Sequence, residues 1–143
     1  MADEQHLSIY LRSEINEVGL HFMPGPVIEA RQDSDRTLRV VLRDLANDKK
    51  PFNLESLGVF EINFIVRTHK YPESEEDIVI KLPQSQILWH QSGYVDFTFT
   101  AEDLQLPVTD YWYDIVIEKV DNLFQAAVSD SIRPPLGVFK VVK

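Results

Sequence analysis

The chain has 143 residues, the size of one domain with a single hydrophobic core. It carries 23 acidic and 14 basic residues, and its formal net charge of −9 at pH 7 disfavours binding to nucleic acid or to an anionic membrane surface. It contains no cysteine, which excludes a disulfide framework, thiolate metal sites and a cysteine nucleophile. Nowhere do about 18 apolar residues follow one another. We therefore expect neither a nucleic-acid partner nor a membrane partner.

Alternating apolar and polar residues recur along most of the chain and predict β-strands. In chain order, the predicted strands cover residues 7–15, 27–31, 37–44, 59–67, 78–82, 94–100, 111–120, 124–132 and 137–143. The clearest patterns are "TLRVVLRD" (37–44), "VFEINFIVR" (59–67), "YVDFTFT" (94–100) and "YWYDIVIEKV" (111–120). Segments rich in proline, glycine and acidic residues separate the strands and predict turns.

The same alternation predicts which side chains enter the core. The inward rows are Leu38, Val40, Leu42, Phe60, Ile62, Phe64, Val66, Val95, Phe97, Phe99, Tyr111, Tyr113, Ile115 and Ile117. One short helical turn is expected near residues 100–106, where Thr100 can cap the turn and Glu102 and Asp103 suit its positive end. The predicted fold class is all-β, an antiparallel sandwich or barrel, with an Ig-like β-sandwich preferred.

The N-terminal region is expected to differ from the rest. Residues 1–25 end at the turn "MPGP" and predict an N-terminal arm or an added strand outside the main sandwich, which then comprises residues 26–143. Extended arms add strands to neighbouring sheets, and residues 7–15 have the required alternation. Deletion of residues 1–25 is expected to abolish assembly and to leave a folded domain.

No segment carries a recognisable catalytic or metal-binding motif. His6, His21, His69 and His90 are dispersed and lack the close spacing of zinc motifs. The acidic segments 33–35 and 73–77 lack the glycine and the terminal glutamate of a calcium loop. Motifs of serine hydrolases and of nucleotide-binding loops are absent. We expect no cofactor, no metal and no enzymatic activity; the alternative is a small hydrolase with a pair of carboxylates.

Two sets of residues are candidates for binding. Candidates for a protein interface are Ile9, Leu11, Arg39, Arg43, Ile65 and Arg67. The arginines between residues 31 and 43 form a locally basic edge. Such an edge suits subunits that bind head to tail or a partner of opposite charge. The alternative is a strand face that is simply exposed to solvent. Candidates for stacking on a sugar are Trp89 and Trp112, with Tyr94, Tyr111 and Tyr113 nearby, although large aromatics in a sandwich more often lie in the core or in an interface.

The order of the segments resembles that of a known family. "ARQDSDRTLRVVLRD" followed by "KKPFNLESLGVFEINFIVR", then "SGYVDFTFTAEDLQLPVTDYWYDIVIEKVDN" and "PPLGVFKVVK", is similar to the N-terminal domain of phage baseplate upper proteins. The resemblance covers residues 27–143 and excludes the first 25 residues. It departs from the family at "VTD" (108–110), where the pattern usually has a glycine, so the type of this turn is open.

The resemblance implies a structural protein of a tailed bacteriophage virion. Such a protein would be an oligomerising adaptor or decoration module at the baseplate, the tail fibre base, the neck or the capsid surface. Its partners would be other virion proteins and copies of itself, with a trimer favoured. It would be made in the host cytoplasm and reside in the virion. A carbohydrate-binding module that uses Trp89 and Trp112 is the alternative.

Overall fold

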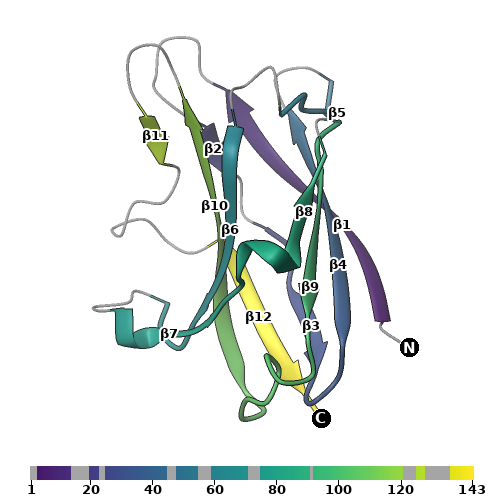
Figure 1. The fold of residues 1–143 in the computed structure, drawn as a ribbon, viewed down its shortest axis with the longest axis vertical. Coiled ribbons are helices and arrows are strands. Elements are labelled where there is room, and N and C mark those ends of the chain that lie inside the picture. The colour runs from purple at the N-terminus through teal and green to yellow at the C-terminus, as the bar shows by residue number, and fades with distance from the viewer. Residues whose placement is uncertain are drawn as a thin grey trace.

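The computed structural model describes residues 3–13, 20–22, 25–44, 48–54, 59–70, 75–90, 92–120, 125–127 and 136–143. Within these ranges the chain forms β-strands and two short 3-10 helices (Figure 1). The strands are β1 (Asp3–Ser13), β2 (Leu20–Phe22), β3 (Ile28–Arg31), β4 (Arg36–Asp44), β5 (Lys50–Pro51), β6 (Val59–Arg67), β7 (Ile78–Lys81), β8 (Ile87–Trp89), β9 (Tyr94–Phe99), β10 (Asp110–Val120), β11 (Gln125–Ala127) and β12 (Gly137–Val142). The 3-10 helices are η1 (Glu75–Asp77) and η2 (Gln84–Gln86). No helix in the described ranges has the length and apolar character needed to cross a membrane.

Two sheets pack face to face, so the predicted all-β sandwich is confirmed (Figure 1). Sheet A has the order β2-β1-β4-β9-β8, with β5 also paired to β4. Sheet B has the order β3-β12-β10-β6-β7, with β11 also paired to β10. The sheets are mixed rather than purely antiparallel, because β1 pairs in parallel with β4 and β3 pairs in parallel with β12. Alternation within a strand sets which face is buried but not the direction of its neighbour, so the sequence did not indicate the parallel pairs.

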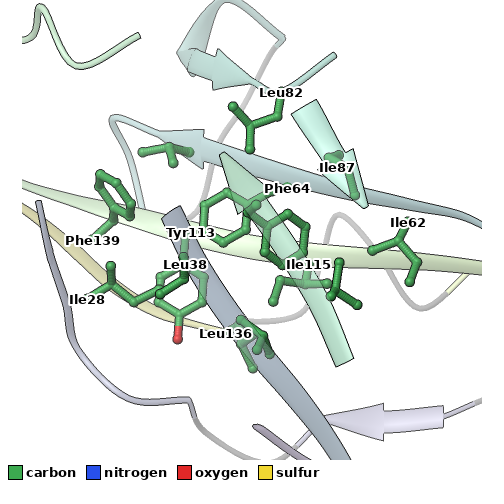
Figure 2. Packing of buried hydrophobic residues seen from close by; sticks show 14 of the residues in the cluster. Ile28, Leu38, Ile62, Phe64, Leu82, Ile87, Tyr113, Ile115, Leu136 and Phe139 are labelled. Carbon is green, nitrogen blue, oxygen red and sulfur yellow. The ribbon is translucent and has the colours of Figure 1, made fainter. Parts of the chain in front are cut away.

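The core lies between the sheets and is built from the predicted inward rows. All the predicted inward side chains within the described ranges are buried; the side chain of Phe60 lies outside them. Phe64 lies at the centre of an aromatic group, with the ring centroids of Phe97, Phe99 and Tyr113 at 4.9, 5.3 and 5.5 Å. Figure 2 shows Phe64 and Tyr113 side by side in this core. Burying each such side chain contributes about 1.5–3 kcal/mol, so these contacts stabilise the sandwich.

The expected turn near residues 100–106 forms as one capped turn. The Thr100 hydroxyl accepts a hydrogen bond from the Asp103 N–H at 3.1 Å, and the Asp103 carboxylate accepts one from the Thr100 N–H at 2.9 Å. These reciprocal bonds satisfy the backbone donors that a turn leaves unpaired. Leu104, fully buried, attaches the turn to the core. Among the described residues, positive φ angles occur at Asp33, Asp48, Lys49 and Gly93, so the segment 108–110 makes its turn without the left-handed backbone that favours glycine.

The N-terminal strand lies within the sandwich. β1 lies between β2 and β4 in sheet A, and Ile9 is 1% exposed in the core. Ile9 is therefore a core residue and not a surface contact, because its position in the alternation points it between the sheets. The backbone of Leu11 pairs with Phe22 and Asp44, while its side chain lies outside the described part of the chain. The division of the chain at residue 26 stays a prediction.

Candidate interaction surface

The outer face of sheet A brings polar and aromatic side chains into register across four strands. Residue pairing aligns His6 of β1 with Arg39 of β4, Arg39 with Asp96 of β9, and Asp96 with Leu88 of β8. Residues two positions along each strand share the same face. This surface, called the sheet A face below, consists of His6, Ser8, Tyr10, Arg39, Val41, Arg43, Leu88, His90, Tyr94 and Asp96.

Arg39 and Asp96 form the central ion pair of the sheet A face. The Arg39 Nε and Nη2 atoms donate to the two carboxylate oxygens of Asp96 at 2.7 and 2.9 Å. The Arg39 guanidinium also lies over the Tyr94 ring, 4.4 Å from its centroid, and the Tyr94 ring contacts the His90 ring at 4.1 Å. Bidentate pairing and stacking restrict the side chains to one arrangement. The centre of the face is therefore ordered before any partner binds.

The hairpin between β8 and β9 positions His90 and Tyr94. Gly93 has φ of 100°, and a Cβ at this position would collide with the carbonyl oxygen of Phe52. The Gly93 carbonyl accepts a hydrogen bond from the Leu42 N–H at 2.8 Å, which attaches the hairpin to β4. Glycine is required here because other residues rarely adopt this backbone and none would fit the space.

Arg39 lowers the pKa of Asp96 below its ordinary value of 3.8, first by hydrogen bonding and then by its charge. Partial burial acts in the opposite direction, while His90 and His6 add smaller lowering contributions. The Asp96 side chain is 15% exposed, so solvent screens this pair only in part. Asp96 therefore stays an anion at neutral pH.

We expect Arg39→Gln to lower the free energy of unfolding by about 1–2 kcal/mol at pH 7, because it leaves the Asp96 charge without its partner. The pKa of Asp96 is depressed in the folded state, so this stabilisation is present above its unfolded pKa and is lost as the pH falls through its folded pKa. Urea unfolding at pH values between 7 and 2 measures the effect, with Arg31→Gln, an exposed arginine on sheet B, as the control. A difference that persists at the lowest pH would contradict the assignment.

A second cationic group lies at the end of β4. The Arg43 Nε atom donates to the Ser8 hydroxyl at 3.0 Å, and its Nη1 atom donates to the Lys49 carbonyl at 3.2 Å. The Lys49 Nζ atom lies 6.0 Å from the centroid of the Tyr10 ring. Tyr10, Arg43 and Lys49 are called the basic corner below.

The six residues predicted for an interface do not form one surface. Arg39 and Arg43 lie together on the sheet A face, whereas Ile65 and Arg67 belong to the outer face of β6 in sheet B. Ile65 is 8% exposed, so it offers little area to a partner. Tyr10 and Asp96 are not among the residues that the sequence predicted for an interface. Alternation places each of them outward, but only the strand register brings Asp96 to Arg39, 57 residues away.

The two tryptophans also lie apart. Trp89 is on β8 in sheet A and packs against the edge of the core, whereas Trp112 is on β10 in sheet B. Tyr111 and Tyr113, 4% and 0% exposed, cannot stack on a ligand at the surface. The predicted sugar-stacking residues therefore do not form a single platform. Within the described ranges, no group of three or more histidine or acidic side chains is arranged to hold a metal ion.

Comparisons with known proteins place the chain by its fold. No protein-family model and no curated protein matches its sequence. Among solved structures, the N-terminal domain of phage TP901-1 ORF48 matches with a TM-score of 0.52 and 10% sequence identity, over 96% of this chain and 98% of that chain. The chain shares the fold of this phage domain. The likeness extends along nearly the whole length of both chains, which a shared local motif would not produce.

Proposed function

We propose that the protein is a non-catalytic structural component of a tailed-phage virion that binds neighbouring subunits, including copies of itself, through the sheet A face. The fold of the N-terminal domain of phage TP901-1 ORF48 supports a phage origin. The order of the sequence segments, which resembles the N-terminal domain of phage baseplate upper proteins, supports a structural role in the same class of particle. The first likeness concerns the path of the backbone, and the second concerns the order of the sequence segments.

The observation that carries the proposal is the ordered, mixed composition of the sheet A face. Arginine and tyrosine are among the residue types that contribute most to binding in protein interfaces. Here Arg39 and Tyr94 are already held in contact, so binding costs little side-chain entropy. Leu88, 60% exposed on the same face, supplies apolar area at its edge. This combination suits a protein partner.

The chemistry of the face supports binding rather than catalysis. A general acid at neutral pH needs a raised carboxyl pKa, whereas the pKa of Asp96 is lowered. Both oxygens of Asp96 are bonded to Arg39, so the carboxylate is also poorly placed to act as a base or a nucleophile. We therefore assign the Arg39–Asp96 pair a structural role.

Within a virion the module acts as an adaptor or a decoration at the baseplate, the tail fibre base, the neck or the capsid surface. Its partners are other virion proteins and further copies of itself, with a trimer as the favoured assembly. It is made in the host cytoplasm and incorporated into the particle. Symmetric assembly is expected because most soluble homo-oligomers have closed symmetry.

The test is the mass of the protein in solution, measured by light scattering across a concentration series. We expect a defined multiple of 16.5 kDa for the unmodified chain and a shift to the monomer for Leu88→Arg. Val108→Arg is the matched control, because Val108 is 51% exposed but lies in the loop before β10, away from the sheet A face. A monomer at every concentration, or equal effects of the two substitutions, would overturn the proposal.

A further inference from the structure

We infer that the basic corner, Tyr10, Arg43 and Lys49, binds carboxylates of a second copy of this chain, so that subunits meet head to tail. This inference rests on the proposed self-association through the sheet A face and specifies which part of the face carries the charge contact. The two arginines of β4 on this face then have different roles. Arg39 orders the face internally, whereas Arg43 contacts the partner.

Arg43 is held in place without being neutralised. Its guanidinium has five N–H donors, and two of them are used by the Ser8 hydroxyl and the Lys49 carbonyl. Both acceptors are neutral, so they orient the guanidinium and leave its charge uncompensated. Among the described residues no carboxylate pairs with Arg43, in contrast to Arg39, which donates two hydrogen bonds to the Asp96 carboxylate. The remaining donors of Arg43 suit the two oxygens of an incoming carboxylate.

Lys49 adds a second cation to the corner. It lies in the turn between β4 and β5 with φ of 61°, and its Nζ atom is placed over the Tyr10 ring. Asp44 follows Arg43 directly, but successive side chains of a strand point to opposite faces, so its carboxylate is not on the sheet A face. A carboxylate docked here contacts two cations while Tyr10 provides apolar area beside them. Partial removal of water by a partner strengthens these ion pairs.

A second copy of the chain has the complementary charge. Acidic residues outnumber basic ones by 23 to 14, so the surface of each copy is rich in carboxylates. The exposed acidic residues in the described ranges are Glu29, Asp33, Asp35, Asp48, Glu76, Glu102 and Asp110, and of these Asp48 directly precedes Lys49. Asp33 and Asp35 lie between β3 and β4, just before the first residue of β4. The basic corner lies beside the last residues of β4, about 30 Å along the strand. Figure 1 shows these two ends of β4 at opposite ends of the sandwich.

This charge distribution selects the type of assembly. A two-fold symmetric contact at the corner would bring Arg43 and Lys49 against the same cations of the partner, which is repulsive. A heterologous contact, in which the corner of one copy meets a different and acidic surface of the next, avoids this repulsion. Heterologous contacts build rings when the rotation between subunits closes. A cyclic assembly is therefore favoured over a two-fold dimer.

The experiment compares three substitutions by sedimentation at about 0.05 M and about 0.5 M salt. Arg43→Gln and Lys49→Gln should each weaken self-association about tenfold at low salt and reduce its salt dependence. Lys50→Gln is the matched control, because it makes the same charge change one residue further along the chain, at the start of β5. The backbone of Lys50 is in register with Asp44, so its side chain is on the opposite face of the sheet from Arg43. The association constant of this control should stay within about twofold of the unmodified chain. Lys49→Gln keeps the test independent of folding, since the Lys49 side chain has no hydrogen bond within the described structure.

The outcomes separate this inference from the proposed function. Equal weakening by Lys49→Gln and Lys50→Gln, or association that does not respond to salt, overturns the head-to-tail contact. If Leu88→Arg still dissociates the assembly in that case, the proposed function stands. A chain that is monomeric in all conditions overturns both.

Discussion

A chain that lacks residues 1–13 should fail to fold into the cooperative sandwich. β1 is paired with β4 from Asp3 to Leu11, and Ile9 is 1% exposed in the core opposite Leu42. Removing the strand leaves the backbone of β4 without its partner on one side and opens the core around Leu42. Unpaired strand edges and exposed core residues also promote aggregation. Circular dichroism during urea unfolding should therefore show no cooperative transition for the truncated chain.

A single substitution measures how much β1 contributes to stability. Ile9→Ala should lower the free energy of unfolding by about 2–5 kcal/mol, because it removes a fully buried side chain and leaves a cavity. Val108→Ala, at a position 51% exposed, is the control and should change stability by less than about 0.5 kcal/mol. Cooperative unfolding of the truncated chain at the same urea concentration as the full chain would show instead that β1 is an accessory arm, as the sequence suggested.

Tyr113→Ala should lower the free energy of unfolding by about 3–5 kcal/mol. Tyr113 is fully buried, its ring stacks on Phe64 with centroids 5.5 Å apart, and its hydroxyl donates to the Pro26 carbonyl at 2.7 Å. The chain passes closely over this ring at Gly137, where a Cβ would lie 2.8 Å from Tyr113 Cε1. Burial raises the pKa of Tyr113, so its hydroxyl stays protonated and keeps donating over the ordinary pH range. The alanine variant loses both the ring and this bond.

Tyr113→Phe separates the two contributions. It keeps the ring and removes only the hydroxyl, which should cost about 1–2 kcal/mol because the Pro26 carbonyl loses its donor. Tyr94→Phe is the control, since Tyr94 acts through its ring contacts with Arg39 and His90. Urea unfolding of the three variants measures the differences. If Tyr113→Phe and Tyr94→Phe have the same stability, the hydrogen bond to Pro26 makes no net contribution.

Local patterns in the sequence predicted much of the fold. The alternation in residues 37–44 separated Val40, which is buried, from Arg39, which is on the outer face, because side chains along a strand alternate with a period of two. It also located β6, β9 and β10. The short strands β2, β5 and β8 have two or three residues each, too few for a period to appear. Only part of the predicted strand 124–132 can be compared, since β11 covers 125–127 and the rest is outside the described residues.

The sequence by itself therefore determined the all-β class, the residues that face the core, the cap at Thr100 and the outward direction of Arg39 and Arg43. These properties depend on residues that are close together in the sequence, and the alternation of side chains along a strand shows them directly. Only the tertiary structure decided that β1 lies in parallel beside β4 with Ile9 in the core, that Asp96 meets Arg39, and that Ile65 lies on the other sheet. The physical reason is that strand order, direction and register arise from pairing between segments far apart in the chain, and alternation within one strand carries no information about its partner.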